Sequence, residues 1–433
     1  MSSEWSMVKL GELADFQEGY VNPSQREPDY FDGDIKWLRA TDLNDGLVTN
    51  TSRTLTEKGF RSAGKSASLF EPGTLAISKS GTIGRVGLLG DRMCGNRAVI
   101  NIKPKSHAIP RYIFFVLRHL RPVVETLAEG SVQKNLYVSA LSNLSIPAPA
   151  RHIQQAIASC LGALDDRIML LRETNKTLEL IAQAIFKSWF VDFDPVHAKM
   201  EGRQPEGMDE ETAALFPDSF EHFANGSVPR GWSLQRLSEA YEINPFRKLK
   251  KGDSSKYLDM ANVPVAGFSI GDIVTRSFSS GSKFSNRDTL LARITPCLEN
   301  GKTAYVDFLD EGEVAWGSTE FIVLRPKGPL PQFHAYLLCR SPSFREHAIK
   351  SMSGTSGRQR VQNDMLGAFL IAVPTLDIAQ KFADICEAIQ VRCTDNQAKS
   401  KTLAALRDTL LPRLISGKLR QPEAQEQVEN ALS

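Results

Sequence analysis

The chain has 433 residues, of which 42% are hydrophobic and 24% charged, as in ordinary globular proteins. A chain of this length exceeds one hydrophobic core, and two domains of roughly 150–200 residues are expected. The 52 basic and 50 acidic side chains leave a net charge of +2. This near-neutral balance argues against a uniformly basic nucleic-acid coat protein but allows local basic patches.

Cysteine usage and hydropathy favour a cytoplasmic protein. The six cysteines are scattered, and no C-x-x-C pair occurs, so we expect buried, reduced thiols and no metal site. The N-terminal segment MSSEWSMVKLGELADF lacks the charged-then-apolar pattern of a signal peptide. Apolar runs are far shorter than the roughly 20 residues that span a bilayer, so no membrane association is expected.

An internal repeat is the strongest feature of the sequence. Apolar residues spaced by threes and fours form one helical stripe that begins at Ile153. The same stripe recurs without a gap 225 positions later, from Ile378. The repeat predicts two long helices, over residues 151–193 and 376–419.

Polar residues interrupt both stripes. Asn175 lies within the first stripe, and Asn396 and Ser400 lie within the second. A polar residue at such a position fixes the register of a coiled coil at some cost in stability. The economical way to bury both stripes is to pack the two helices, of about 50–60 Å at 1.5 Å per residue, against each other. If they pack antiparallel, the two domains lie at opposite ends.

The repeat extends into the segments that precede each helix. The paired segments begin at Trp37 and Tyr257, at Pro72 and Arg287, and at Cys94 and Trp316. A segment rich in proline and glycine has no counterpart and reads as a linker, in which MDEETAALF suggests a short helix. The predicted order is a first domain (1–150), a long helix (151–193), the linker (194–231), a second domain (232–375), a long helix (376–419) and a polar, disordered tail (420–433).

Four motifs resemble those of a known family. FKSWFVDFDPVHAKMEG starts at Phe186 and LLPRLISGKL at Leu410, each at the end of a predicted helix. SKSGTIGRVG starts at Ser78 and LLARITPCLENGK at Leu290. With these motifs the chain resembles, over nearly its whole length, the specificity subunit of type I restriction–modification enzymes.

The resemblance implies an α+β fold in which two mixed α/β target-recognition domains are separated by two long antiparallel helices. It implies binding of double-stranded DNA at an asymmetric bipartite target, recruitment of two adenine-methylating modification subunits, and support for restriction (helicase–nuclease) subunits. It also implies no catalytic centre and no cofactor in this chain. Two alternatives stay open on residues alone: a self-contained modifying enzyme, and a two-headed scaffold that reads no DNA sequence.

Glycine-bearing polar loops are the candidates for DNA contact. Base edges are read by Arg, Lys, Asn, Gln, Ser and Thr, and phosphates are bound by cations and backbone amides. Two loop triplets, 133–135 and 358–360, coincide position for position under the 225-residue offset. The predicted DNA-binding residues are Lys79, Thr82, Arg85, Asn96, Arg97, Gln133, Lys134, Asn135, Arg293, Lys302, Ser318, Thr319, Arg358, Gln359 and Arg360.

The ends of the long helices are the candidates for partner binding. More aromatic side chains gather at the end of the first helix than one coiled-coil stripe needs, which favours a protein interface. The predicted partner-binding residues are Phe186, Trp189, Phe190, Asp192, Phe193, Asp194 and Leu414.

Two motifs imitate enzyme signatures. GFRSAGKS, residues 59–66, matches the phosphate-loop pattern, but the flanking segments do not suit a strand followed by a helix. Asn244-Pro245-Phe246 is one proline short of the adenine-methyltransferase motif and reads as a turn. Neither motif is expected to bind a cofactor.

Overall fold

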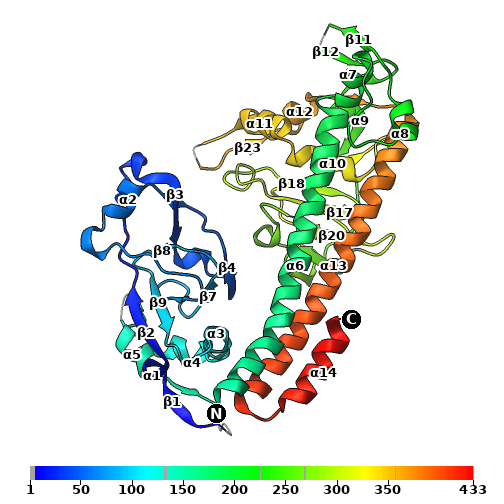
Figure 1. Ribbon diagram of the computed structural model, residues 1–433. Helices are drawn as coiled ribbons and strands as arrows, with labels where there is room; N and C mark the ends of the chain where they lie inside the picture. Colours follow the sequence, from blue (N-terminus) through cyan, green and yellow to red (C-terminus); the bar gives the residue numbers. More distant parts are fainter. Residues whose placement is uncertain (1–4, 131–133, 225, 268–269, 356, 433) are drawn as a thin grey trace. The chain divides into compact units, whose positions relative to one another are not determined.

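The computed structural model divides the chain into two compact units (Figure 1). Unit 1 comprises Met1–Leu170 and Lys399–Ser433, and unit 2 comprises Leu171–Ala398. The boundary falls within both long helices, so each unit holds one α/β domain and one part of each helix. The structure describes residues 5–130, 134–224, 226–267, 270–355 and 357–432.

The two long helices confirm the expectation from the repeat. Helix α6 (Arg151–Phe190) has 40 residues and α13 (Leu376–Ser416) has 41, so each is about 60 Å long. Helix α6 ends at Phe190, and three residues later Phe193 adopts a left-handed φ of 55° before α7 begins. Helix α13 ends before Gly417, whose φ is 82°.

The parts of these helices that lie in unit 2 run antiparallel. Near the C-terminal end of α6, Phe186 and Phe190 contact Phe382 with ring centroids 6.5 and 4.7 Å apart. Eleven residues earlier in α6, Asn175 Nδ2 donates to the carbonyl of Cys393, 2.9 Å away and eleven residues later in α13. Residue numbers therefore rise along one helix as they fall along the other, as predicted.

Unit 1 contains a five-stranded sheet in the order β2-β9-β6-β7-β4 and a three-stranded sheet in the order β5-β3-β8. The β6 segment Leu-Ala-Ile-Ser is buried on both faces, which explains its nearly continuous apolar sequence. The strands are β1 (Met7–Lys9), β2 (Ala14–Glu18), β3 (Phe31–Leu38), β4 (Gly46–Val48), β5 (Thr54–Leu55), β6 (Leu75–Ser78), β7 (Val86–Leu89), β8 (Cys94–Gly95), β9 (Val99–Pro104) and β10 (Ser145–Pro147). The shorter helices are α1 (Leu10–Leu13), α2 (Glu57–Arg61), α3 (Pro110–His119), α4 (Arg121–Thr126), α5 (Val138–Ser142) and α14 (Gln421–Leu432).

Unit 2 contains two four-stranded sheets, in the orders β14-β21-β18-β19 and β16-β15-β20-β17. The strands are β11 (Phe220–Phe223), β12 (Gly226–Pro229), β13 (Ser233–Arg236), β14 (Tyr241–Ile243), β15 (Ser254–Leu258), β16 (Ile273–Ser277), β17 (Ser282–Ser285), β18 (Thr289–Ala292), β19 (Thr303–Tyr305), β20 (Val314–Gly317), β21 (Phe321–Pro326), β22 (Met352–Ser353), β23 (Arg360–Val361) and β24 (Leu370–Val373). The shorter helices are α7 (Asp194–Met200), α8 (Glu210–Leu215), α9 (Leu237–Ala240), α10 (Phe333–Arg340), α11 (Pro342–Lys350) and α12 (Asn363–Gly367).

The same pattern of strand pairing occurs inside each of the two units. In unit 1, β3 pairs in parallel with β8 and places Trp37 opposite Cys94. In unit 2, β15 pairs in parallel with β20 and places Tyr257 opposite Trp316. These are two of the segment pairs that the sequence repeat identified, so the duplication extends to the domains.

One alignment of the repeat is wrong by one residue. The sequence comparison matched Leu75 of β6 with Leu290 of β18. The sheets place Leu75 opposite Ile102 and Thr289 opposite Leu324, so Leu75 is equivalent to Thr289. Both strands are buried on both faces, and their composition therefore carries no alternation that could fix the register.

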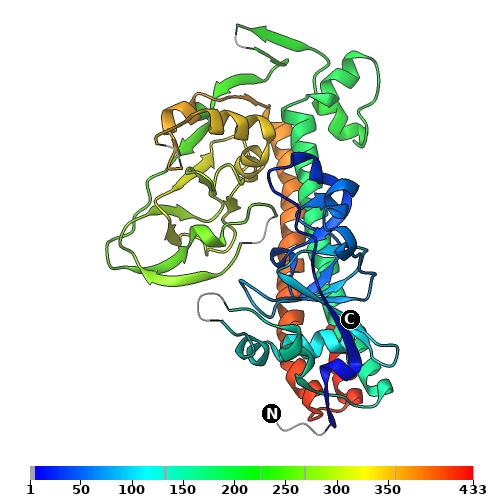
Figure 2. The same ribbon diagram turned by 90° about the vertical axis from the view of Figure 1, so that its left-hand side faces the viewer.

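The linker folds as part of unit 2. Figures 1 and 2 show α7 and α8 beside the C-terminal end of α6. Helix α8 confirms the short helix expected in the acidic stretch, and Asp209 caps it by accepting a hydrogen bond from the amide of Thr212 at 2.7 Å. Val196, Phe216 and Val228 are buried in the core of this unit.

The polar tail is not disordered, and that expectation was wrong. Residues 421–432 form α14, which runs back beside the end of α13 (Figure 1). Ala424 and Val428, one helical turn apart, are buried, so even this polar segment presents an apolar face to unit 1. Among the described residues, no helix is long and apolar enough to cross a lipid bilayer.

Candidate nucleic-acid interface

Three predicted DNA-contact loops of unit 1 meet through backbone hydrogen bonds. The amide of Lys79, in the loop after β6, donates to the carbonyl of Ala98 at 2.9 Å. The carbonyl of Lys79 accepts from the amide of Leu136 at 2.9 Å. The loop after β6, the turn before β9 and the loop before α5 are therefore held side by side.

Unit 2 repeats this arrangement. The amide of Arg293, in the loop after β18, donates to the carbonyl of Glu320 at 2.9 Å. The carbonyl of Arg293 accepts from the amide of Val361 at 2.9 Å. Lys79 and Arg293 thus occupy equivalent positions, and each unit carries one three-loop cluster built from the same backbone contacts.

In unit 1, the side chains of the cluster differ in their freedom to reach a ligand. Lys79 is paired with Glu18, with Nζ 2.7 Å from Oε2. Asn96 Oδ1 accepts from the amide of Ala98 at 3.0 Å and so stabilises the turn. The side chains left at the surface belong to Thr82, Arg97 and Lys134, with Arg85 and Asn135 half-buried. Gln133 lies outside the described residues.

In unit 2, an ion pair links two loops of the cluster. The guanidinium of Arg360 binds the carboxylate of Glu320 through two nitrogens, with Nη2 2.6 Å and Nε 2.9 Å from its oxygens. This hydrogen bonding is the largest cause that lowers the pKa of Glu320, and it raises the pKa of Arg360. Arg293 Nη2 donates to the carbonyl of Val361 at 2.7 Å. The arginines therefore help to hold the loops together.

The remaining predicted residues of unit 2 divide into structural and exposed ones. Lys302 Nζ donates to the carbonyl of Met260 at 2.5 Å, and Ser318 Oγ accepts from the amide of Glu320 at 3.2 Å. Gln359 is tied through its backbone to Thr295. Thr319 and Arg358 are exposed.

Glycine allows the loops their shape. Gly81 and Gly84, in the loop after β6, have φ values of 75° and 82°, which an L side chain rarely adopts. In unit 2, Gly301 has a φ of 79° in the corresponding loop. The loops fold back on themselves at these positions, because the amide of Gly84 donates to the carbonyl of Ser78 at 3.0 Å and that of Gly301 to the carbonyl of Leu298 at 2.8 Å.

Most of the predicted partner-binding residues are buried by this chain itself. Phe186, Trp189 and Phe190 are in the core of unit 2, where Phe190 packs on Trp232 with centroids 5.8 Å apart. Leu414 is buried in unit 1. The aromatic excess over one helical stripe is thus explained by the linker and the second domain, which cover it.

The polar members of the set remain accessible. Asp194 is exposed at the start of α7, and the half-exposed carboxylate of Asp192 is paired with Lys187. Phe193 is half-buried between the rings of Phe220 and Trp232. The surface that a partner can reach here is therefore acidic rather than aromatic.

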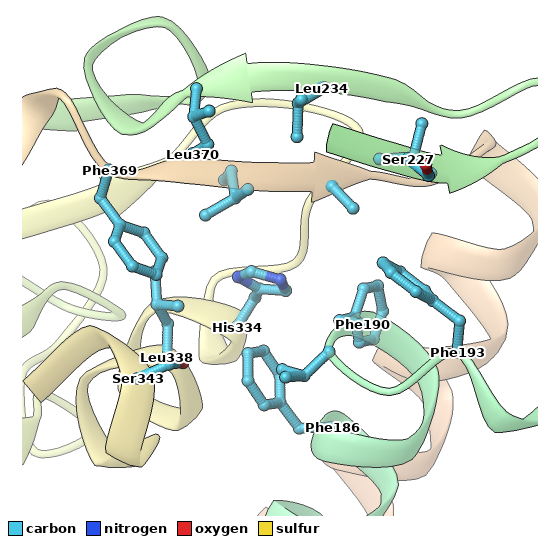
Figure 3. A pocket seen from close by; sticks show the side chains of 14 residues that line it. Phe186, Phe190, Phe193, Ser227, Leu234, His334, Leu338, Ser343, Phe369 and Leu370 are labelled. Carbon is cyan, nitrogen blue, oxygen red and sulfur yellow. The ribbon is translucent and has the colours of Figure 1, made fainter. Parts of the chain in front are cut away.

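A hollow of about 280 Å³ lies beside these aromatic residues (Figure 3). Phe186, Phe190 and Phe193 line one side, and His334 of α10 points into it. His334 is only 1% exposed and its Nδ1 contacts the hydroxyl of Tyr241. Burial lowers the pKa of His334 to about 3, so the imidazole is neutral.

Neither enzyme-like motif has the geometry of an enzyme site. Residues 59–66 lie in α2 and the short turn after it, with Gly59 inside the helix. Asn244 has a left-handed φ of 54°, and its Oδ1 accepts from the amide of Val323 at 2.9 Å, which makes Asn244-Pro245-Phe246 the turn that was predicted.

Sequence reasoning missed the acidic side chains of the two clusters. Glu18 is 61 residues from Lys79, and Glu320 is 40 residues from Arg360. No local pattern links such distant partners. The repeat gave a usable signal for Glu320 alone, which lies in the aligned segment that begins at Trp316, whereas Glu18 lies in β2.

Comparison with known proteins finds similarity to type I restriction enzyme specificity subunits. A family model described as the type I restriction modification DNA specificity domain matches residues 2–180. The chain is 23% identical to the type I restriction enzyme MjaIX specificity subunit of Methanocaldococcus jannaschii, over 97% of this chain and 94% of that protein. It is 25% identical to the HindI specificity subunit of Haemophilus influenzae, over 73% of this chain and 79% of that protein.

The fold also has a solved counterpart. The S subunit of a type I restriction–modification system from M. genitalium matches 95% of this chain and 96% of its own, with a TM-score of 0.51 at 15% identity. Over nearly its whole length the chain is therefore similar to type I restriction enzyme specificity subunits.

Proposed function

We propose that this chain is the DNA-specificity subunit of a type I restriction–modification complex. It binds an asymmetric bipartite target in double-stranded DNA and positions adenine-methylating and restriction subunits on it, in the cytoplasm. The observation that carries the proposal is the three-loop cluster that recurs in both units. The same backbone frame presents different side chains, which is what two different half-sites require.

The chemistry of the clusters favours DNA over a scaffold function. The exposed members are Thr82, Arg97 and Lys134 in unit 1 and Thr319 and Arg358 in unit 2. Cations bind phosphates, and Arg, Lys and Thr side chains read base edges in the major groove. A scaffold without DNA reading has no need for two cationic clusters that share one loop frame.

We assign the two recognition domains to residues 1–150 and 232–375 and the spacing function to the long helices. Helices of about 60 Å correspond to about 18 base pairs at roughly 3.4 Å per pair. The linker at 194–231 packs with the second domain and joins the repeats. We place catalysis in the partner subunits, because Asn244-Pro245-Phe246 is one proline short of the adenine-methyltransferase motif.

We assign the docking of modification subunits to the acidic end of α6. Asp194 is exposed there and Asp192 is held by Lys187, whereas the neighbouring aromatic residues are buried. Reversing both charges, Asp192→Lys with Asp194→Lys, is expected to abolish co-purification of the modification subunit and to lower the thermal unfolding temperature only slightly, because the ion pair of Asp192 with Lys187 is at the surface. Undiminished co-purification contradicts this assignment.

The methylation pattern of host DNA tests the function itself. With the gene present, we expect one bipartite motif to carry methylated adenine on both strands. Deletion of the gene is expected to remove methylation at that motif and at no other. An unchanged pattern, in cells that express the modification subunit, favours the scaffold alternative.

A further inference from the structure

Unit 2 exposes a short segment with the sequence Phe-Arg-Lys-Leu-Lys-Lys, residues 246–251, between β14 and β15. The ring of Phe246 is 88% exposed, more than any other large hydrophobic side chain among the described residues. Burial of a phenyl group away from water is favourable, so an exposed ring lacks that stabilisation. Such exposure at a fixed position suggests a contact with another molecule.

The backbone on the N-terminal side of Phe246 is held rigidly. The amide of Asn244 donates to the carbonyl of Val323 at 2.7 Å, and its Oδ1 accepts from the amide of the same residue. Pro245 restricts the backbone before the ring. The exposure of Phe246 is therefore not the result of a frayed end.

The C-terminal side is held equally well. Arg247 Nε donates to Ser285 Oγ at 3.0 Å, and Arg247 Nη2 lies 3.2 Å from the buried carboxylate of Asp288. Lys283 Nζ donates to the carbonyl of Leu249 at 2.9 Å. The amide of Gly252 donates to the carbonyl of Phe278 at 2.8 Å.

Three cations accompany the exposed ring. Lys248, Lys250 and Lys251 are exposed, and within the described part of the chain none of their ammonium groups forms a salt bridge with a carboxylate. Elsewhere some exposed lysines are paired, as Lys350 is with Glu346. Three unneutralised charges in four residues fit a polyanion better than an apolar protein surface.

The segment adjoins the three-loop cluster of unit 2. Phe246 and Lys283 line a hollow of about 290 Å³ together with Arg293 and Thr319. Arg293 is the residue whose backbone holds the cluster together, and Thr319 is an exposed predicted DNA contact. The ring and the cluster therefore share one surface within unit 2.

We propose that residues 246–251 are a second DNA-contacting element of unit 2, an inference that rests on the proposed DNA-reading function. Lys248, Lys250 and Lys251 bind phosphates, and the ring of Phe246 packs against the C5 methyl group of a thymine in the major groove. That methyl group is the apolar feature that the major-groove edges present, and phenylalanine is one of the side chains that contact it.

Salt dependence tests the lysines. The full chain, assembled with its modification subunits, is titrated with target DNA and with unrelated DNA at several salt concentrations. The triple variant K248A/K250A/K251A is expected to bind target DNA and unrelated DNA more weakly by the same factor. It should also reduce the slope of log K against log salt by about 2–3, at roughly 0.9 per phosphate contact. The control Lys350→Ala, also in unit 2, is expected to leave the slope unchanged. An unchanged slope in the triple variant overturns the proposal for the lysines.

Thymine-to-uracil replacement tests the ring. Phe246→Ala is expected to weaken target binding about tenfold and binding to unrelated DNA less than twofold. One uracil replacement in the half-site should cost the wild-type complex a similar factor and cost the Phe246→Ala complex nothing further. The control Phe223→Ala, on the hairpin β11–β12, should bind as the wild type does.

The outcomes separate this inference from the function on which it rests. A wild-type complex that does not prefer its target over unrelated DNA contradicts the proposed function. If the wild-type complex prefers its target and the Phe246→Ala complex prefers it equally, the role of the ring is contradicted. Loss of the modification subunit from the Phe246→Ala complex, with DNA affinity retained, assigns the segment to a protein partner and overturns the proposal.

Discussion

Arg358 and Arg360 lie in the same loop but differ in what holds them. Arg360 is committed to Glu320, whereas Arg358 is exposed, and no side-chain partner is found for it in the described part of the chain. A guanidinium that is free before binding can contact DNA without first breaking an ion pair.

We therefore predict that Arg358→Ala weakens target binding about tenfold and relaxes specificity at one base pair. Arg360→Ala should instead loosen the loop cluster, because Glu320 loses its partner. Equilibrium binding to a panel of single-base target variants measures both effects. An Arg358→Ala complex with wild-type affinity and specificity contradicts this placement of the residue.

His334 makes the stability of unit 2 depend on pH. Its pKa is lowered from 6.5 to about 3 because burial disfavours the charged imidazolium. Between these values the unfolded chain binds a proton that the folded chain does not. The free energy of unfolding is therefore expected to fall as pH falls from about 6.5, by up to about 1.4 kcal/mol per pH unit.

His334→Gln removes this titration and retains a group that can hydrogen-bond Tyr241. Urea unfolding between pH 7 and pH 4 should show a shallower pH dependence in this variant than in the wild type. Because carboxylates titrate in the same window, the comparison is between the two slopes. If the free energy of unfolding has the same pH dependence in both proteins, His334 is protonated in the folded state at the same pH as in the unfolded chain, and the expected effect is absent.

At the scale of single residues, the sequence predicted which loops are equivalent in the two units. It did not predict which side chains form ion pairs. The offset of 225 residues aligned the loop of Leu136 with that of Val361, and both do bond the equivalent residues Lys79 and Arg293. That Lys79 and Arg360 are already paired could not be foreseen, because their carboxylate partners are distant in sequence.

Among the elements, the long helices carry a polar contact in their interface. Asn396 Nδ2 donates to Asn175 Oδ1 at 2.8 Å, and Asn175 Nδ2 donates to the carbonyl of Cys393. Asn396 is buried, so removing its partner leaves a polar group without a hydrogen bond. This pair fits the register-fixing role expected from the sequence.

Replacing Asn175 alone with leucine is expected to lower the free energy of unfolding by about 1–3 kcal/mol. Replacing Asn175 and Asn396 together with leucine should recover most of that loss, because no buried polar group is left unpaired. Chemical denaturation of the full-length variants measures the difference. If the double variant is as unstable as the single one, the lost stability comes from the hydrogen bond between Asn175 and Asn396 and not from a buried polar group left without a partner.

Helices were predicted from sequence more reliably than strands or the tail. A stripe of ten or more apolar positions marks α6 and α13 within a few residues of their ends. The strands β6 and β18 are too uniformly buried to fix their alignment, which is why it was wrong by one residue. The tail was misjudged because Ala424 and Val428 make a narrow apolar face within a polar composition.

The whole molecule consists of two units that repeat one plan. Each combines a mixed α/β domain, a three-loop cluster and parts of both long helices. The sequence predicted this plan because duplication preserved the helical register. It could not predict which bases are read, because that depends on how loop side chains meet a groove.

The central claim is that each unit reads its own half of the target, and methylation mapping tests it most directly. Host DNA methylation is compared between cells with the wild-type chain and cells with Thr319→Ala and Arg358→Ala in unit 2. We predict that one half of the bipartite motif becomes degenerate while the other half and the spacing stay unchanged. Degeneracy in both halves, or an intact motif at undiminished specificity, would contradict the claim.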